Sequence, residues 1–349
     1  MKRYILTLII AVFALMQAAA QTYDNLWKQA DIIARKDQPR SEIGVMKKII
    51  SKASAAKDYG QLLAAEMRQM ILWKEISADS LTPNVERMEA EVLKVKDPAL
   101  KAVRYAVLGK VYRDMNEKKS EEFFKKALQQ PELLVKHTST EYIPLTLKGV
   151  DGSSFNNDLL HLIGFEADSK EAYHLMYTYY NKVGNRGAAC LCAYKLIEKY
   201  RQDDVREVKK SKYLHTIDSL IHVYQDIPEA GELAVEHFRF MEGATDAKPL
   251  DKLNYINYAL NRWGGWSRMN VLRNAQKRLT EPMFQVQDMP LVLRPSEKWV
   301  HLNVRNLQNL NIRLSRLNIT ADNEYDAQNE ATYKMLLKKT TKLHQKDFS

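Results

Sequence analysis

Apolar residues recur at helical spacing over residues 21–282. Ile43, Met46, Ile50 and Ala53 follow one another at intervals of three or four residues, and later segments repeat this spacing. Short polar or glycine-containing stretches interrupt the pattern. The sequence therefore predicts a succession of helices, each about 12 to 20 residues long, joined by short connections.

Helix starts and turns are expected at several points in this region. Thr82–Pro83 and Asp97–Pro98 each place a capping side chain before a proline, and a proline in the first helical position loses no hydrogen bond. Asp168–Glu171 resembles a capping box at the start of a helix. Gly60 and Gly184 fall where the pattern needs turns.

Part of this helical region repeats. Tyr105, Leu108, Gly109 and Tyr112 occupy first-helix positions of the tetratricopeptide pattern. A degenerate second copy begins at Tyr173, 68 residues later, which is twice the tetratricopeptide period of about 34 residues. One helix pair cannot bury its apolar face without stacked neighbours. We therefore expect a mainly α fold, a tetratricopeptide-like helical-repeat array over residues 21–282.

The periodicity changes near residue 283. Apolar and polar residues alternate over 299–304 and again over 310–315, which predicts two half-buried strands joined by a hairpin turn at 306–309. Two or three strands are too few for an independent sheet, and the polar, Lys-rich segment 321–349 does not complete one. We interpret residues 283–349 as an incomplete β domain and expect the chain to be a fragment of a longer polypeptide.

The first 20 residues resemble a secretory signal peptide. Met1–Arg3 is basic, Tyr4–Met16 is apolar apart from one threonine, and Gln17–Ala20 ends in small residues. The sequence predicts cleavage between Ala20 and Gln21 and a periplasmic or otherwise exported protein. The apolar run is shorter than a bilayer requires, so a permanent anchor is the weaker alternative, and no transmembrane segment is expected after cleavage.

The chain is basic, with 53 Lys and Arg against 43 Asp and Glu, and a formal charge of +10. Loss of the leader would lower the charge to +8. Acidic and basic residues are intermixed, as in Arg206–Lys210, which is typical of solvated helix faces. Export and intermixing argue against a nucleic-acid partner, while acidic glycans, membrane phosphates and acidic proteins stay open as partners.

No catalytic, cofactor or metal site is predicted. Phosphate loops, nucleophile elbows and paired zinc-binding cysteines are missing from the sequence. Cys190 and Cys192 point about 200° apart on a predicted helix, which favours small core residues over a disulfide. His215 and His222 are seven residues apart, too far for one metal ion, which favours surface or capping histidines. His161 has no specified partner, which favours a structural hydrogen bond over a catalytic role.

Aromatic residues supply the candidate binding sites. Tyr173, Tyr177 and Tyr180 form one helical stripe, and Trp263 and Trp266 flank a pair of glycines. Core packing is the default interpretation of such a stripe, and a recognition surface is the alternative, because tyrosine combines contact area with a hydroxyl group. The candidate partner-binding residues are therefore Tyr177, Tyr180, Trp263 and Trp266.

Five segments resemble one family. Tyr23–Gln29, Phe155–His161, Gly184–Ala189, Trp263–Asn274 and Trp299–Leu317 are similar to the N-terminal part of exported alpha-2-macroglobulin-like proteins of Bacteroidetes-type bacteria. The resemblance implies that a helical lead-in precedes the first strands of a macroglobulin-type β-sandwich. It also implies a broad-range protease inhibitor, in which a cut bait segment triggers rearrangement and a Cys–Gln thioester captures the protease.

The chain departs from this family in one respect. Neither Cys190 nor Cys192 is followed by the Gly-Glu-Gln of a thioester, and no bait region is recognisable. The resemblance therefore implies a non-enzymatic N-terminal scaffold without cofactors, whose partners are proteases or cell-envelope proteins. The alternative is a stand-alone periplasmic scaffold of tetratricopeptide type that binds envelope proteins.

Overall fold

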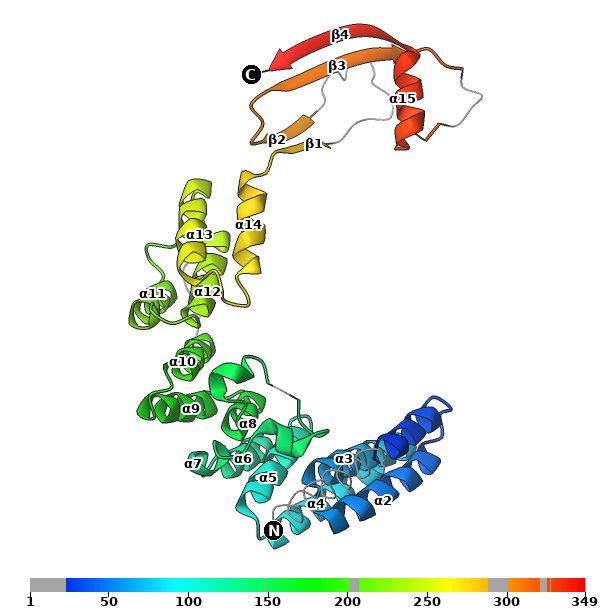
Figure 1. Ribbon diagram of the computed structural model, residues 1–349, viewed down its shortest axis with the longest axis vertical. Helices are drawn as coiled ribbons and strands as arrows, with labels where there is room; N and C mark the ends of the chain where they lie inside the picture. Colours follow the sequence, from blue (N-terminus) through cyan, green and yellow to red (C-terminus); the bar gives the residue numbers. More distant parts are fainter. Residues whose placement is uncertain are drawn as a thin grey trace, which may run out of the picture. The chain divides into compact units, whose positions relative to one another are not determined.

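The computed structural model describes residues 23–147, 149–200, 207–287, 301–320, 325–326 and 328–348. Within these ranges the protein is mainly helical, with short antiparallel strands toward the C-terminal end (Figure 1). The expected signal peptide, its cleavage site and the start of the strand expected over 299–304 lie outside the described residues.

Residues 23–34 are helical, and the helices that follow are mostly two to five turns long. Their bounds are α2 Pro39–Ala56, α3 Tyr59–Ile76, α4 Leu81–Lys94, α5 Pro98–Tyr112, α6 Glu117–Ala127, α7 Pro131–Leu134, α8 Leu159–Ala167, α9 Lys170–Lys182, α10 Arg186–Tyr200, α11 Lys212–Tyr224, α12 Ala230–Gly243, α13 Pro249–Trp263, α14 Asn270–Thr280 and α15 Glu330–Lys338. Short 3₁₀ helices are η1 Ala78–Ser80, η2 Ser139–Tyr142 and η3 Gly152–Phe155. The strands are β1 Met283–Gln287, β2 His301–Arg305, β3 Leu310–Leu317 and β4 Thr340–Phe348.

The chain divides into two compact units. The first contains residues 1–248 and 261–269, and the second contains 249–260 and 270–349. Helix α13 therefore contributes to both units. All the candidate partner-binding residues lie in the first unit, and β1 to β4 lie in the second.

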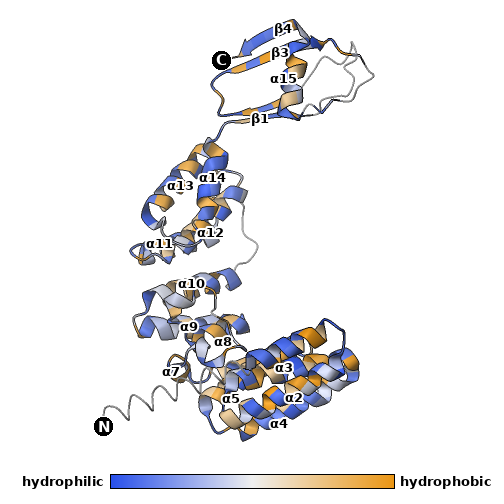
Figure 2. Ribbon diagram, turned by 45° about the vertical axis from the view of Figure 1, so that its right-hand side comes forward, coloured by the Kyte–Doolittle hydropathy of each residue, from blue (hydrophilic) through white to orange (hydrophobic). Residues whose placement is uncertain are grey.

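Packed neighbouring helices make up the first unit, and their apolar faces form its core (Figure 2). Met46 and Ile49 of α2 pack with Leu72 of α3 in one cluster near the N-terminal end. Further along the chain, a larger cluster joins α5, α6 and α8 to α9 and α10 and includes Tyr173 and Tyr180. The helical spacing of apolar residues thus predicted which faces are buried.

Capping side chains fix several helix starts. Asp97 accepts a hydrogen bond from the Leu100 amide at 2.9 Å, so Asp97–Pro98 begins α5 as expected. Thr82–Pro83 does not begin a helix, because α4 already starts at Leu81. The prediction at Asp168 is one residue early: Ser169 caps α9, while Asp168 takes left-handed backbone angles at the end of α8.

The two predicted turn glycines behave differently. Gly184 has φ +78° between α9 and α10, which is the turn expected from the sequence. Gly60 lies inside α3, so the prediction of a turn there is wrong. A Cβ at Gly60 would overlap the backbone of Tyr142 and Ile143, and glycine is therefore needed for close packing and not for a turn.

The Phe155–His161 segment spans the end of the long α7–α8 connection and the first turn of α8. Asn156 and Asn157 both have left-handed backbone angles, which asparagine tolerates better than most residues. Asp158 then caps α8 by accepting the His161 amide at 2.8 Å, and the Phe155 and His161 rings stack with centroids 4.0 Å apart. Local backbone geometry and packing account for the residue types of this segment.

The strands pair differently from the expected hairpin. β2 is antiparallel to β1, and β3 is antiparallel to β4, so the predicted pairing of 299–304 with 310–315 is wrong. Asn306, expected in the hairpin turn, instead donates its side-chain amide to the carbonyls of Leu279 and Glu281, at 2.6 and 3.1 Å. These bonds tie the end of β2 to the end of α14, beside the start of β1.

The segment 321–349 contains more regular structure than its polar composition suggested, because α15 and β4 lie within it. The expected burial of one strand face is also wrong for Ile312, which is exposed. Along β3 the ribbon alternates between hydrophobic and hydrophilic residues (Figure 2). The alternation predicted a strand correctly, but Ile312 on its apolar face and Leu317 at its end are exposed.

Candidate protein-binding surface

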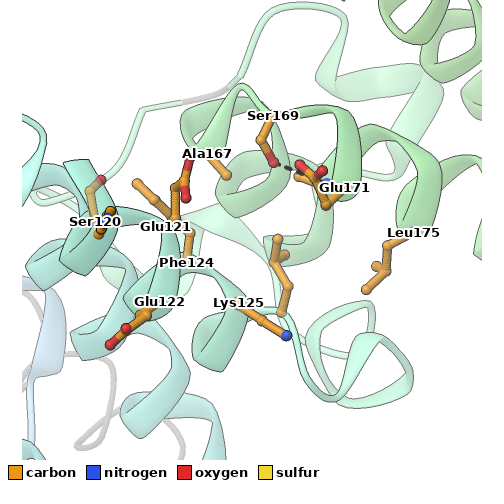
Figure 3. Close-up of a pocket in the computed structure, with 12 residues that line it drawn as sticks. Ser120, Glu121, Glu122, Phe124, Lys125, Ala167, Ser169, Glu171 and Leu175 are labelled. Atoms are coloured by element: carbon orange, nitrogen blue, oxygen red, sulfur yellow. Dashed lines mark hydrogen bonds between the residues drawn. The ribbon is translucent and has the colours of Figure 1, made fainter.

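A groove of about 620 Å³ lies between α6 and the start of α9 (Figure 3). Phe124 and Leu128 from the α6 side, and Ala172 and Leu175 from α9, give it an apolar floor. Its rim carries charges of both signs: Lys118, Lys125, Glu121, Glu122 and Glu171. An apolar floor with a charged rim suits contact with a polypeptide.

Tyr180 and Tyr177 from the predicted stripe have different environments. The Tyr180 side chain is 2 % exposed, and its hydroxyl donates to both carboxylate oxygens of Asp158, at 2.8 and 3.0 Å. Tyr177 is half-buried and hydrogen-bonds with the Tyr224 hydroxyl. Burial and this bond raise the pKa of Tyr224. Tyr180 thus serves the core in this structure, and Tyr177 keeps a surface available for contacts.

The two tryptophans bind neighbouring helices of the first unit. Trp263 is buried, and its indole nitrogen donates to the Gln225 carbonyl at 3.2 Å. Trp266 is half-buried, and its indole nitrogen donates to Oε2 of Glu232 at 2.9 Å. A Cβ at Gly231 would lie 2.7 Å from the Trp266 Cβ, so glycine at this position of α12 allows Trp266 to approach.

Arg268 organises a second cleft near Trp266. Its guanidinium forms two hydrogen bonds with Asp151, at 3.1 and 2.7 Å, and another with Glu232. The same group lies over the Trp266 ring, 5.1 Å from the centroid. These two carboxylates raise the pKa of Arg268, against the effect of burial.

This second cleft has a volume of about 450 Å³. Tyr194, Lys195 and Glu198 of α10 line it, together with Phe165 and Arg239. Sequence reasoning missed the Arg268 network, because Asp151 is 117 residues away from Arg268 and nothing in the sequence links them.

Asp158 and His161 are buried ionisable groups. Burial raises the pKa of Asp158 to about 6, although hydrogen bonds from His161, Tyr180 and Leu160 oppose this. Burial lowers the pKa of His161 to about 4, and Nε2 of its ring has no hydrogen-bond partner among the described residues. His161 also contacts Phe165 edge-to-face at 4.6 Å. His161 is thus held in the core by ring packing, and the hydrogen bond expected from the sequence is not found at Nε2 among the described residues.

The cysteines and the other two histidines considered in the sequence are either buried in the core or exposed on the surface. Cys190 and Cys192 are free and buried in α10, as the core interpretation predicted, and burial raises the pKa of both thiols. His215 and His222 are exposed on α11, in agreement with the surface interpretation. Among the residues that the structure describes, no group of three or more His, Cys, Asp or Glu side chains is arranged to hold a metal ion.

No protein-family model and no curated protein matches this chain. Within the described ranges, none of the helices combines the length and apolar character needed to cross a bilayer. The candidate binding surfaces are the α6–α9 groove, with its apolar floor and charged rim, and the cleft beside Arg268.

Proposed function

We propose that this chain is a non-enzymatic scaffold: the helical lead-in and opening strands of an exported protease inhibitor of alpha-2-macroglobulin type. One observation carries the proposal. The β1–β2 ribbon is amphipathic, and its apolar face is uncovered among the described residues.

The register defines this apolar face. Phe284 pairs with Val304, and Val286 pairs with Leu302, and directly paired residues of an antiparallel ladder point to the same side. Phe284, Val286 and Val304 are all exposed. Two-stranded ribbons are marginally stable in water and gain stability when a second sheet covers the apolar face. A sandwich of macroglobulin type would provide that cover.

The helical unit would then serve as a platform for protein contacts. The α6–α9 groove and the half-buried Tyr177 and Trp266 offer apolar area beside charged or hydrogen-bonding groups. Capture chemistry is not assigned to this chain, since Cys190 and Cys192 are buried and lack the thioester motif. Protease trapping would therefore depend on other macroglobulin-type domains in the same assembly.

The proposal can be tested in the cell envelope of the source organism. A tagged form of the chain would be isolated from the cell envelope after the envelope has been exposed briefly to trypsin. We expect it to co-purify with macroglobulin-type sandwich domains and with retained trypsin. The Phe284→Asp/Val304→Asp variant should lose both, because charges on the apolar face prevent a second sheet from covering it.

Gln285→Asp, on the opposite face of the same ribbon, is the matched control and should behave like the parent chain. The proposal is wrong if the parent chain is recovered without sandwich domains or trypsin. It is also wrong if the two aspartates on the apolar face have no effect on recovery.

A second function is a tetratricopeptide-type scaffold that binds envelope proteins directly. Close packing of α5 on α6 favours it: the Ser120 hydroxyl donates to the Gly109 carbonyl at 2.7 Å, and a Cβ at Gly109 would lie 2.8 Å from the Phe124 ring. This function predicts that Tyr177→Ala weakens capture of an envelope protein at least tenfold, whereas Tyr333→Ala does not. Equal capture by both variants would exclude Tyr177 as a contact.

A further inference from the structure

A third groove lies between α5 and α8, and no step of the proposed function uses it. Val103, Ala106, Val107 and Lys110 of α5 line one wall, and Leu159, Leu162, Ile163 and Glu166 of α8 line the other. Both sets follow the spacing i, i+3, i+4, i+7, so each is one continuous helix face. Val103, Val107, Leu159 and Ile163 are at most 8 % exposed, so a ligand would contact mainly the half-buried Ala106 and Leu162 on these faces. The groove has a volume of about 380 Å³.

Residues of the α7–α8 connection extend the apolar wall. Leu145, Leu147 and Val150 line the groove, and the side chains of Leu147 and Val150 are 82 % and 69 % exposed. Large aliphatic side chains that are this exposed beside an apolar groove are typical of an interaction site. The groove and the exposed wall therefore form one apolar surface.

Charged residues close one end of the groove. Nζ of Lys110 lies 3.1 Å from Oε2 of Glu166, and Nη1 of Arg113 lies 3.1 Å from Oε1 of the same carboxylate. Two cations share one carboxylate, so this end carries an excess of one positive charge. A ligand that places a carboxylate there would complement it.

The lining also restricts the shape of the ligand. The side chains that α5 and α8 contribute to the groove are aliphatic except at its charged end, and the Thr146 hydroxyl already donates to the Ser139 carbonyl, so these side chains offer few hydrogen bonds to a polypeptide backbone. An extended peptide would leave its N–H and C=O groups unpaired against these walls, which is costly. A helix satisfies these groups internally and can present an apolar stripe while its polar face stays in water.

We propose that the α5–α8 groove binds an amphipathic helix of a partner protein, with an acidic residue of that helix placed against Lys110 and Arg113. Each wall stripe spans about 10 Å at about 1.5 Å per residue, which matches roughly two turns of the bound helix. The site does not depend on the proposed inhibitor role, because it lies within the first unit and involves none of the strands.

A peptide-display selection on the full chain tests this site. The probe is a library of 14-residue helix-forming peptides, and affinities of the enriched peptides are measured by fluorescence anisotropy. We expect enriched peptides with apolar residues at i, i+3 or i+4, and i+7, and with Asp or Glu at one end of the stripe. Leu147→Asp and Lys110→Glu should each weaken their binding at least tenfold.

The matched control is Leu93→Asp, at a leucine on α4 that is 69 % exposed and lies outside the groove, which should bind like the parent. All three substitutions are at exposed side chains, so circular dichroism should show an unchanged helix content. The proposal is overturned if no enriched peptide depends on Leu147 and Lys110, or if the enriched peptides lack the acidic residue. It is also overturned if laurate binds the groove while the peptides do not.

Discussion

The hydroxyl of Tyr180 donates to both carboxylate oxygens of Asp158, which lies 22 residues earlier in the chain. Asp158 in turn caps α8 by accepting the amide of His161. This buried carboxylate therefore links the start of α8 to the last turns of α9. The link explains why a residue of the predicted tyrosine stripe is part of the core.

Tyr180→Phe should destabilise the helical unit by about 1.5–3 kcal/mol, because it removes the side-chain donor to a buried carboxylate. Guanidinium unfolding followed by circular dichroism measures the change. Tyr333→Phe, at an exposed tyrosine, should change stability by less than about 0.5 kcal/mol. Equal effects of the two substitutions would contradict the role of the Tyr180 hydroxyl.

Asp158 and His161 should affect the pH dependence of stability in opposite directions. The pKa of Asp158 is raised to about 6, so the folded state retains a proton that the unfolded chain loses above about pH 4, and stability falls from pH 4 to 6. The pKa of His161 is lowered to about 4, so stability rises between pH 4 and 6.5. Across its pH range, each group changes the free energy of unfolding by about 3 kcal/mol.

Two variants separate these contributions. Relative to the parent chain, Asp158→Asn should gain stability as pH rises from 4 to 6.5, and His161→Gln should lose it over the same range. Unfolding free energies at half-unit pH steps measure both slopes. Parallel pH profiles for the parent and the two variants would show that neither group titrates as its burial requires.

Gly60→Ala and Gly44→Ala should have opposite effects. A Cβ at Gly60 would overlap the backbone at Tyr142 and Ile143, so the substitution must displace that connection and should cost about 1–3 kcal/mol. Gly44 has open space around it inside α2, and alanine there should stabilise by about 0.5–1 kcal/mol through helix propensity. Thermal melts of the two variants check the sign of each change.

Arg268→Ala should lower stability by about 3 kcal/mol, because it leaves the carboxylates of Asp151 and Glu232 without their shared cation. Arg186→Ala is the comparison: the Arg186–Asp226 pair is solvent-exposed, and its loss should cost far less. Guanidinium unfolding of both variants gives the difference. Similar losses would mean that Arg268 is not the partner these carboxylates need.

Native protein should resist thiol labelling at pH 8. Cys190 and Cys192 are the two cysteines of the chain, both are buried, and burial raises the pKa of both. A chromogenic disulfide reagent should label neither thiol before unfolding and both in denaturant. Ser219→Cys, on the exposed side of α11, should add one thiol that reacts at once. Rapid labelling of the parent chain would contradict the packing of α10.

Local signals predicted much of the helical unit. Asp97 caps α5, Gly184 makes the turn after α9, and the apolar spacing placed Tyr173 and Tyr180 on a buried face. These features depend on residues within a few positions of one another. The capping side chain, the positive φ and the helix period are each set by the local chain.

Tertiary contacts decided what the sequence could not. Gly60 was expected in a turn, but its missing Cβ matters because a connection some 80 residues later lies against it. Asn306 was expected in a hairpin turn, but its side chain binds the end of α14. Strand β3 pairs with β4, which follows α15 in the sequence, and not with β2.

By itself, then, the sequence determined the helical period, several caps and the change from helices to strands, because these follow from side chains close together along the chain. The pairing of the strands, the Arg268 network and the groove between α5 and α8 were decided by the tertiary structure alone. Each joins residues that are tens of positions apart, and their proximity depends on how whole elements pack.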